Sequence, residues 1–146
     1  LSSLEARVTM TRLAIAGHSG FEVSLLEACR KGPSFTVDTL RSLKLRYPGA
    51  RLYLLIGEDS LNDFRTWHQP LEIMRHSTLA VAVRPGAKRQ ATARPRILRL
   101  ENPGLALSSS AIRTRIRSGH SVRYLLPELV ARYIARHHLY AHAESR

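Results

Sequence analysis

Two short, uninterrupted apolar runs constrain the fold of this chain more than any other feature. They span Leu52–Gly57 and Thr78–Val83. Each run is short and lacks the alternation of a half-exposed strand, so each predicts a strand that is covered on both faces, as in parallel sheets. A third, shorter strand is expected at Ile97–Leu100. Because helical patterns lie between the strands, the chain is expected to be an α/β protein with a Rossmann-like open parallel sheet and crossover helices.

Helical periodicity fills much of the remaining sequence. Ser2 and Glu5 have the spacing of a capping box, which predicts a helix over residues 3–16. The break at Gly32-Pro33 precedes a second helix, for which Ser34 or Thr36 is the expected cap. Further elements are expected as a short strand at 21–23 and helices over 70–76, 108–118 and 127–137.

Positive charge is concentrated in the second half of the chain. The net charge is +12, with 9 Lys/Arg against 8 Asp/Glu in residues 1–72 and 14 against 3 in residues 73–146. Such a field attracts nucleotides, nucleic acids or anionic membrane surfaces without choosing among them. Residues 87–95 are expected to form a basic loop. No apolar run approaches the roughly 20 residues of a membrane span, and no signal peptide is evident, so a soluble cytoplasmic protein is expected.

The segment Leu107–Arg113 places three serines at a predicted helix start and an arginine in the first turn. Unpaired N–H groups and the positive end of the helix dipole favour a phosphate at such a position. The hydroxyls of Ser108, Ser109 and Ser110 can cap the helix or bond the phosphate, and the guanidinium of Arg113 can grip it in bidentate fashion. By itself the serine run is more often a plain cap.

Residues after the first strand suggest a second set of contacts. Gly57 permits close approach of a ligand to the backbone, and Glu58-Asp59 offers a carboxylate for ribose hydroxyls. A helix start is the alternative role for Asp59. Gly57, Arg84 and the serine segment all follow predicted strands, so we expect them to gather at the carboxyl edge of the sheet.

Aromatic and hydroxyl side chains suggest a third set. Trp67 and His68 would suit stacking on a flat heteroaromatic ring, although a tryptophan is most often part of the core. Thr36 could direct its hydroxyl and N–H at an acidic substituent or simply cap its helix. Cys29 is the only cysteine, which excludes an internal disulfide and a cysteine-based zinc site.

In this order, six segments resemble motifs of bacterial nicotinate-nucleotide adenylyltransferases, nucleotidyltransferases of NAD biosynthesis. Phe35 stands where that family has tyrosine, and Ser110 where it has threonine. The six segments are Gly32–Leu40 (Gly-Pro-Ser-Tyr-Thr-x-x-Thr-Leu in the family), Leu55–Ser60 (Ile-Ile-Gly-x-Asp), Thr66–His68 (Thr-Trp-aromatic), Arg84–Gly86 (Arg-Pro-Gly), Leu107–Arg113 (Ile-Ser-Ser-Thr-x-Ile-Arg), and Tyr124–Pro127 with His138–Tyr140.

The resemblance implies transfer of AMP from ATP to nicotinate mononucleotide, which yields deamido-NAD and pyrophosphate, with Mg²⁺ accompanying ATP. It implies no covalent intermediate and no metal ligand from the protein. By the family pattern the ATP phosphates go to Ser108, Ser109, Ser110 and Arg113, the adenosine to Gly57, Asp59 and Arg84, and the nicotinate ring with its carboxylate to Thr36, Trp67 and His68.

One family motif has no match in these 146 residues. Family members begin with a strand and a glycine-rich turn that carries Gly-x-Phe-x-Pro-x-His-x-Gly-His, whose histidines contact the transferring phosphate. The resemblance therefore implies an N-terminally truncated nucleotidyltransferase fold, a single domain over 1–146 without its first βα unit. It also implies that this chain contains no catalytic residue of that motif and has little or no activity alone.

Two alternatives stay open at this point. One is a basic nucleic-acid-binding domain that uses the arginines of 84–99 and 113–123, although no nucleic-acid motif accompanies the charge. The other is a sister nucleotidyltransferase, such as a pantetheine-phosphate adenylyltransferase, against which Trp67 beside the Thr36 turn argues. The expected partners are ATP and nicotinate mononucleotide, with neither membrane nor nucleic acid, and a homo-oligomer is left open.

Overall fold

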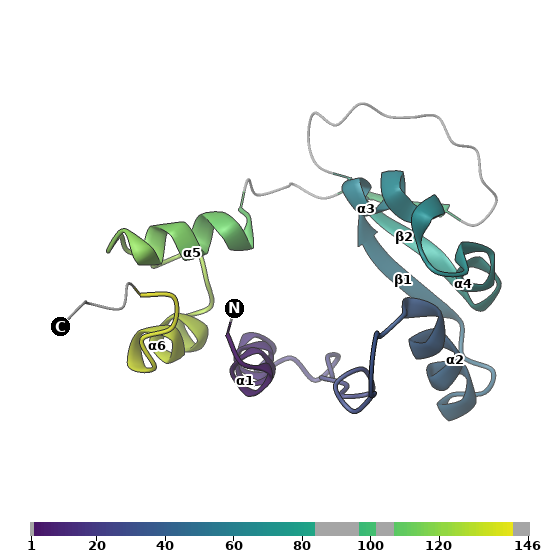
Figure 1. The fold of residues 1–146 in the computed structure, drawn as a ribbon, viewed down its shortest axis with the longest axis horizontal. Coiled ribbons are helices and arrows are strands. Elements are labelled where there is room, and N and C mark those ends of the chain that lie inside the picture. The colour runs from purple at the N-terminus through teal and green to yellow at the C-terminus, as the bar shows by residue number, and fades with distance from the viewer. Residues whose placement is uncertain (1, 84–96, 102–106, 142–146) are drawn as a thin grey trace. The chain divides into compact units, whose positions relative to one another are not determined.

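The computed structural model describes residues 2–83, 97–101 and 107–141. The chain divides into two compact units, one made of Leu1–Leu25 with Ala106–Arg146 and the other of Leu26–Leu105 (Figure 1). The expectation of a single domain over all 146 residues stays a prediction. The expected basic loop at 87–95 lies outside the described residues.

A parallel sheet forms the centre of the unit Leu26–Leu105. Its strands are β1 (Leu52–Gly57), β2 (Ser77–Val83) and β3 (Ile97–Glu101), in the order β1-β2-β3. The register pairs Gly57 with Ala82 and Val83 with Glu101, so the three strands end at one edge of the sheet. This confirms the α/β fold with an open parallel sheet that the apolar runs predicted.

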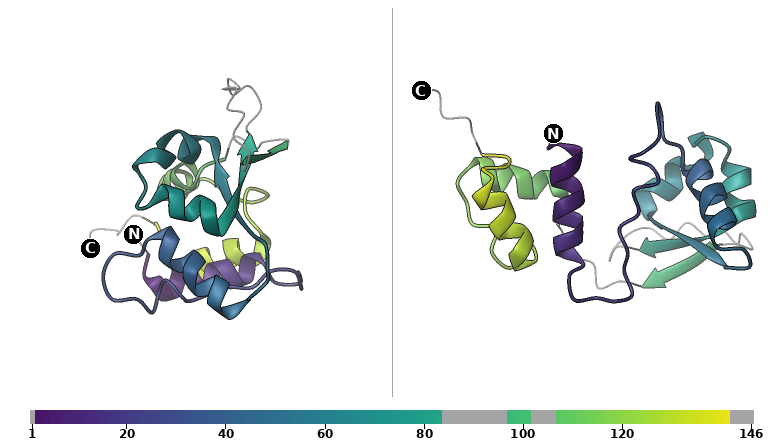
Figure 2. Two further views of the ribbon diagram at one scale, coloured as in Figure 1. Left: turned by 90° about the vertical axis from the view of Figure 1, so that its right-hand side faces the viewer. Right: turned by 90° about the horizontal axis from the view of Figure 1, so that it is seen from below.

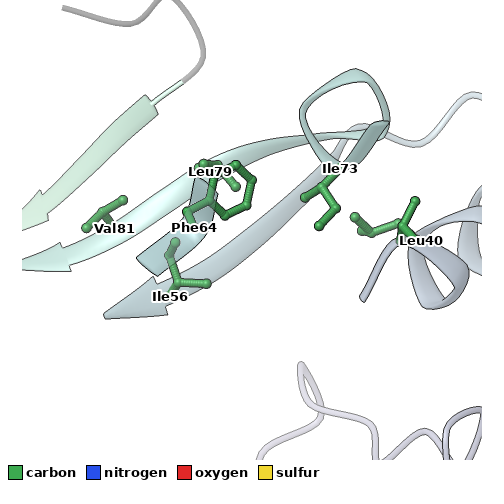
Figure 3. Close-up of a cluster of buried hydrophobic side chains, with 7 residues drawn as sticks. Leu40, Ile56, Phe64, Ile73, Leu79 and Val81 are labelled. Carbon is green, nitrogen blue, oxygen red and sulfur yellow. The ribbon is translucent and has the colours of Figure 1, made fainter. Parts of the chain in front are cut away.

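Helices in the same unit supply the other half of its core. They are α2 (Thr36–Arg46), α3 (Glu58–Asp63), the short 3₁₀ turn η1 (Phe64–Thr66) and α4 (Pro70–His76). Figure 3 shows buried side chains converging from α2, β1, η1, α4 and β2. Full burial of one such side chain contributes about 1.5–3 kcal/mol to folding. The cluster consists of Val37, Leu40, Ile56, Phe64, Ile73, Leu79 and Val81.

The prediction that β1 is covered on both faces is wrong for the described structure. Leu52, Leu54 and Ile56 face the core, whereas Tyr53 and Leu55 are 55% and 64% exposed. Successive side chains of a strand point to opposite faces, and the core cluster lies on only one of them. An uninterrupted apolar run therefore did not report how many faces of the strand are covered.

The described residues of the other unit form three helices, α1 (Leu4–Ala14), α5 (Ser109–Arg117) and α6 (Glu128–Arg136), as seen in Figure 2. Each contributes buried side chains, with Ala6 from α1, Ile112 from α5, and Val130 and Ile134 from α6. The spacing of the last two places them on one face of α6. The hydroxyl of Tyr140 lies 2.9 Å from the hydroxyl oxygen of Ser2, which ties the segment after α6 to the start of α1.

Two local predictions fail in this unit. The capping box from Ser2 is wrong because α1 begins one residue later: Ser3 is the N-cap, and its hydroxyl accepts from the Ala6 N–H at 3.1 Å. The strand expected at 21–23 is also wrong, since the structure has no strand at these residues. A strand needs a hydrogen-bonded neighbour, and no described strand pairs with this segment.

No helix in the described part of the chain combines the length and apolar character that crossing a membrane requires.

Candidate functional site

The start of α5 is built by Ser108. This residue is the N-cap, in an extended conformation, and its side-chain oxygen accepts from the Ala111 N–H at 3.1 Å. The capping role foreseen as the alternative for the serine run therefore holds for Ser108. The N–H groups of Ser109 and Ser110, the first two of the helix, have no carbonyl one turn earlier to bond. They remain as donors at the positive end of the helix dipole.

Arg113 adds a full positive charge to the same end of α5. Its Nη2 donates to the hydroxyl oxygen of Ser110 at 3.1 Å, so the side chain folds back toward the helix start. The first turn of α5 contains no acidic residue to neutralise it. Exposed serines, N–H groups without an intrahelical acceptor and a guanidinium thus lie together, and an anion at this point would meet donors of all three kinds.

A cavity of about 610 Å³ adjoins this helix start within the three-helix unit. Ser108, Ser109 and Arg113 line its polar part, and side chains such as Met10 and Leu126 line its apolar part. There is therefore room for a ligand group beside the donors of α5.

Gly57 ends β1 and is the N-cap of α3. Its φ of −81° is one that any residue adopts, and no described atom lies within 4 Å of the place where a Cβ would stand. Neither the backbone nor a neighbour requires glycine here, so the open space in front of Gly57 suits an approaching ligand. Asp59 is exposed in the first turn of α3, as its sequence position suggested.

Glu58, between them, has a partner that the sequence analysis did not identify. Its Oε1 accepts from Arg99 Nη1 at 3.2 Å, whereas its Oε2 is buried and accepts no hydrogen bond from the described residues. Arg99 lies 41 positions away and reaches Glu58 because β3 pairs with β2 and β2 with β1. No local spacing could have indicated this contact.

Thr36 is the first residue of α2, and Phe35 occupies the N-cap position without a side-chain cap. The prediction that Ser34 or Thr36 caps this helix is therefore wrong. Phe35 has an extended backbone and offers no acceptor, so the N–H groups of Thr36 and Val37 are left without an intrahelical partner. The start of α2 is a second place where an anion would find backbone donors.

Trp67 and His68 occupy different environments. Trp67 is half-buried, packs on Phe64 at 5.5 Å between ring centroids and adjoins the core cluster, as its core alternative foresaw. His68 is exposed and stacks on Phe35, with ring centroids 4.2 Å apart and planes 29° apart. Because Phe35 immediately precedes Thr36, this stack brings His68 to the start of α2.

Arg41 and Gln69, which the sequence analysis did not single out, reinforce this junction. Arg41 Nη2 donates to Gln69 Oε1 at 2.7 Å, and Gln69 Nε2 lies 3.2 Å from His68 Nε2. Gln69 has a φ of 52°, a left-handed conformation that only tertiary contacts hold in a non-glycine residue. Arg41 also pairs with Asp38 at 3.3 Å.

A polar network holds the segment before α2 against that helix. Arg30 donates through Nη1 to Thr39 Oγ1 at 2.8 Å and through Nη2 to Ser42 Oγ at 3.0 Å. Thr39 in turn donates to Glu27 Oε1 at 2.8 Å. Arg30 Nη1 also lies 3.4 Å from Ser34 Oγ. The turn that leads into Thr36 is therefore attached to α2 by side chains on both sides of it.

The sequence-predicted residues thus form two described groups. Ser108, Ser109, Ser110 and Arg113 belong to the three-helix unit, and Gly57, Asp59, Thr36, Trp67 and His68 belong to the sheet unit. Contacts link Thr36 with His68 through Phe35. Arg84 lies outside the described residues. The gathering of all three post-strand segments at one edge stays a prediction, as do the assigned roles.

Comparisons with known proteins bear on the whole chain. A family model described as cytidylyltransferase-like matches residues 1–115. A probable nicotinate-nucleotide adenylyltransferase of Thermomicrobium roseum is 38% identical over 153 residues, which cover 99% of this chain and 72% of the relative. Its counterpart in Thermus thermophilus is 40% identical over 136 residues, covering 93% and 73%.

The fold is also found in solved structures. One is Plasmodium falciparum nicotinic acid mononucleotide adenylyltransferase complexed with APC, with a TM-score of 0.75 and 20% identity over 96% of this chain and 77% of that one. The same enzyme complexed with NaAD has a TM-score of 0.76 over 96% and 75%. At this identity the likeness concerns the fold alone.

Proposed function

Because the chain belongs to the nicotinate-nucleotide adenylyltransferase family of cytidylyltransferase-like nucleotidyltransferases, we propose that it serves the transfer of AMP from ATP to nicotinate mononucleotide. The products are deamido-NAD and pyrophosphate. The single observation that carries the proposal is the start of α5, where Arg113 folds back on Ser110 beside two backbone N–H groups that lack an intrahelical acceptor. This is an arrangement that suits the phosphates of a nucleotide.

The reaction requires alignment of the two substrates and stabilisation of charge, and it needs no covalent enzyme intermediate. An oxygen of the mononucleotide phosphate forms a bond to the α-phosphorus of ATP, and the bond from that phosphorus to the oxygen that bridges the α- and β-phosphates breaks, so that this oxygen becomes a terminal oxygen of pyrophosphate. The electron pair of the broken bond leaves with pyrophosphate. Groups that hold both substrates in line, and that stabilise charge on the departing oxygens, therefore account for most of the catalysis.

The ATP end of the site is assigned to three serines and four further residues. The N–H groups of Ser109 and Ser110, with the guanidinium of Arg113, are proposed to hold the phosphates and to stabilise charge on pyrophosphate as it leaves. The hydroxyl of Ser108 caps the helix and so maintains that geometry. The adenosine is assigned to Gly57, Asp59 and Arg84, with the open space at Gly57 in support.

The nicotinate end is assigned to Thr36, Trp67 and His68. The uncapped start of α2 offers N–H donors to a carboxylate, and the stack of His68 on Phe35 holds an imidazole next to it. The half-buried Trp67 is anchored on Phe64 and offers an aromatic surface for the pyridine ring.

Mg²⁺ is expected to enter with ATP as the counter-ion of this substrate, because Mg²⁺ is commonly held by substrate phosphates with one or two carboxylates. Within the described residues there is no cluster of three or more His, Cys, Asp or Glu side chains that could hold a metal ion.

These 146 residues contain no match to Gly-x-Phe-x-Pro-x-His-x-Gly-His. The resemblance described above implies that the histidines of that motif contact the transferring phosphate. We therefore expect this chain to bind both nucleotides and to release pyrophosphate slowly or not at all by itself. Addition of a family segment that carries the motif is expected to restore turnover.

Calorimetric titration with a non-hydrolysable ATP analogue tests the proposal on this chain. Arg113→Ala should lower the affinity about 10- to 100-fold, because a charge-assisted pair of hydrogen bonds to phosphate is lost. Arg117→Ala is the matched control: it removes an arginine of the same helix whose guanidinium bonds Thr114 instead. Equal affinities for the two variants would contradict the assignment of the phosphates to the start of α5.

The same titration separates the enzyme from a basic nucleic-acid-binding domain. An oligonucleotide that binds more tightly than the mononucleotides, with a steep loss of affinity on adding salt, would favour the nucleic-acid alternative. Saturable binding of deamido-NAD that changes little with salt would favour the adenylyltransferase.

A further inference from the structure

A chain of polar contacts leads from α2 to His68. Asp38 pairs with Arg41 at 3.3 Å, Arg41 donates to the Gln69 amide at 2.7 Å, and that amide lies 3.2 Å from His68 Nε2. Of these residues only His68 has been assigned to the substrate. The other three are partners that the fold supplies, since Arg41 and Gln69 lie 28 positions apart.

The chemistry of the donors fixes the direction of the hydrogen bonds from Arg41 to Gln69 and from Gln69 to His68. A guanidinium has only N–H donors, so the Gln69 atom that faces Arg41 must be the carbonyl oxygen. The amide NH₂ of Gln69 then faces His68, and it also can only donate. His68 Nε2 must therefore accept with its lone pair. A neutral imidazole that accepts at Nε2 carries its proton on Nδ1.

Two contacts then hold the ring itself. Gln69 engages the ring edge at Nε2, and Phe35 covers a ring face with 4.2 Å between centroids. Rotation of the imidazole would break one contact or the other. The left-handed backbone of Gln69 keeps its short side chain within reach of both Arg41 and His68. His68 is thus presented in one orientation and as one tautomer.

We propose that Arg41 and Gln69 are positioning residues that hold His68 as an Nδ1–H donor and so make the nicotinate end of the site selective for an acid over its amide. This inference rests on the proposed function and adds a selectivity device to it. A pyridine carboxylate accepts hydrogen bonds at both oxygens, from the His68 Nδ1–H and from the N–H groups at the start of α2. A carboxamide has an NH₂ in place of one oxygen, and that NH₂ would face a donor without finding an acceptor.

The tautomer is measured directly by NMR of this chain labelled with ¹⁵N-histidine, with His68→Phe identifying the signals. In the wild type we expect a protonated Nδ1 and an unprotonated Nε2. Gln69→Glu replaces the amide donor by a carboxylate that only accepts, so the proton should move to Nε2. A wild-type ring protonated at Nε2, or an unchanged tautomer in Gln69→Glu, would overturn the inference.

Substitutions of Arg41 separate positioning from mere packing. Arg41→Met leaves nothing to orient the Gln69 amide, so we expect a mixture of tautomers, whereas Arg41→Lys keeps a donor and should keep the Nδ1–H form. Arg46→Met is the matched control, because it removes an arginine of the same helix that lies over the Tyr47 ring. Amide spectra of each variant check that the fold is retained. Loss of the Nδ1–H form in the control would contradict the role of Arg41.

The consequence for selectivity is measured by titrating nicotinate mononucleotide and nicotinamide mononucleotide. We expect Gln69→Leu to lower the acid-to-amide ratio of affinities about 5- to 20-fold and to leave the affinity for the ATP analogue unchanged. An unchanged ratio would overturn this inference and leave the proposed function standing. Binding of the ATP analogue with no binding of either mononucleotide to the wild type would overturn both.

Discussion

Gly57→Ala separates an effect on stability from an effect on ligand binding. We expect the substitution to leave the free energy of unfolding nearly unchanged and to weaken binding of the ATP analogue. Gly57 has a φ of −81° and a ψ of 166°, and no described atom lies within 4 Å of a Cβ at this position. Alanine adopts such an extended conformation without strain, and the stiffer unfolded chain stabilises the variant by about 0.4–1 kcal/mol. Alanine is a poorer N-cap than glycine by a similar amount, about 0.5–1 kcal/mol. The two effects offset, so the free energy of unfolding should change by less than about 0.5 kcal/mol.

Binding of the ATP analogue should respond quite differently to the same methyl group. If the adenosine lies against the backbone at Gly57, the added Cβ occupies the space of the ligand, and we expect the affinity to fall at least about tenfold, equivalent to ~1.4 kcal/mol. The assays are urea unfolding followed by circular dichroism and calorimetric titration of the analogue. An unchanged affinity in a variant of unchanged stability would refute the assignment of the adenosine to Gly57.

Gly49→Ala is the control with the reverse expectation. Gly49 has a φ of +85°, where a side chain is strained, yet a Cβ there meets nothing within 4 Å. We expect a loss of about 1–2 kcal/mol in the free energy of unfolding and an unchanged affinity for the analogue.

Three further substitutions test the contacts that build the two units. Ser108→Ala removes the cap of α5 and should cost about 1 kcal/mol of stability in urea unfolding, whereas Ser109→Ala, which removes no described cap, should cost less than half as much. Arg30→Ala breaks hydrogen bonds on both sides of the turn before α2, so limited proteolysis should cut residues 26–35 at least several-fold faster than in Lys31→Ala; equal rates would contradict the network. Ile73→Ala empties a fully buried position and should cost about 2–5 kcal/mol, with a loss below 1 kcal/mol showing that the core cluster is not packed as described.

Local patterns predicted most of the regular elements, and the reason is the short range of the forces involved. The apolar runs led to β1 and β2, and the predicted helices over 70–76, 108–118 and 127–137 correspond to α4, α5 and α6. Errors arose where the choice of the N-cap among neighbouring residues depends on small differences in free energy. Ser3 rather than Ser2 caps α1, and Phe35 precedes α2 where a hydroxyl residue was expected.

In the candidate site, too, local contacts could be predicted from the sequence and long-range contacts could not. Ser108, Arg113 and Thr36 could be found from sequence because a helix start and its donors lie within one turn. The ion pair of Glu58 with Arg99 could not be found in this way, because Arg99 reaches Glu58 through the strand order of the sheet.

What the sequence by itself determined is the parallel α/β architecture and the family, because the alternation of elements, helical spacing and motif order can be read along the chain. Tertiary structure alone decided which face of β1 is covered, which partner Glu58 finds, and which carbonyl oxygen accepts from Arg41. Each of these depends on atoms that chain connectivity leaves far apart, such as Arg41 and Gln69. Only the packing of α2 against α4 brings them within hydrogen-bonding distance.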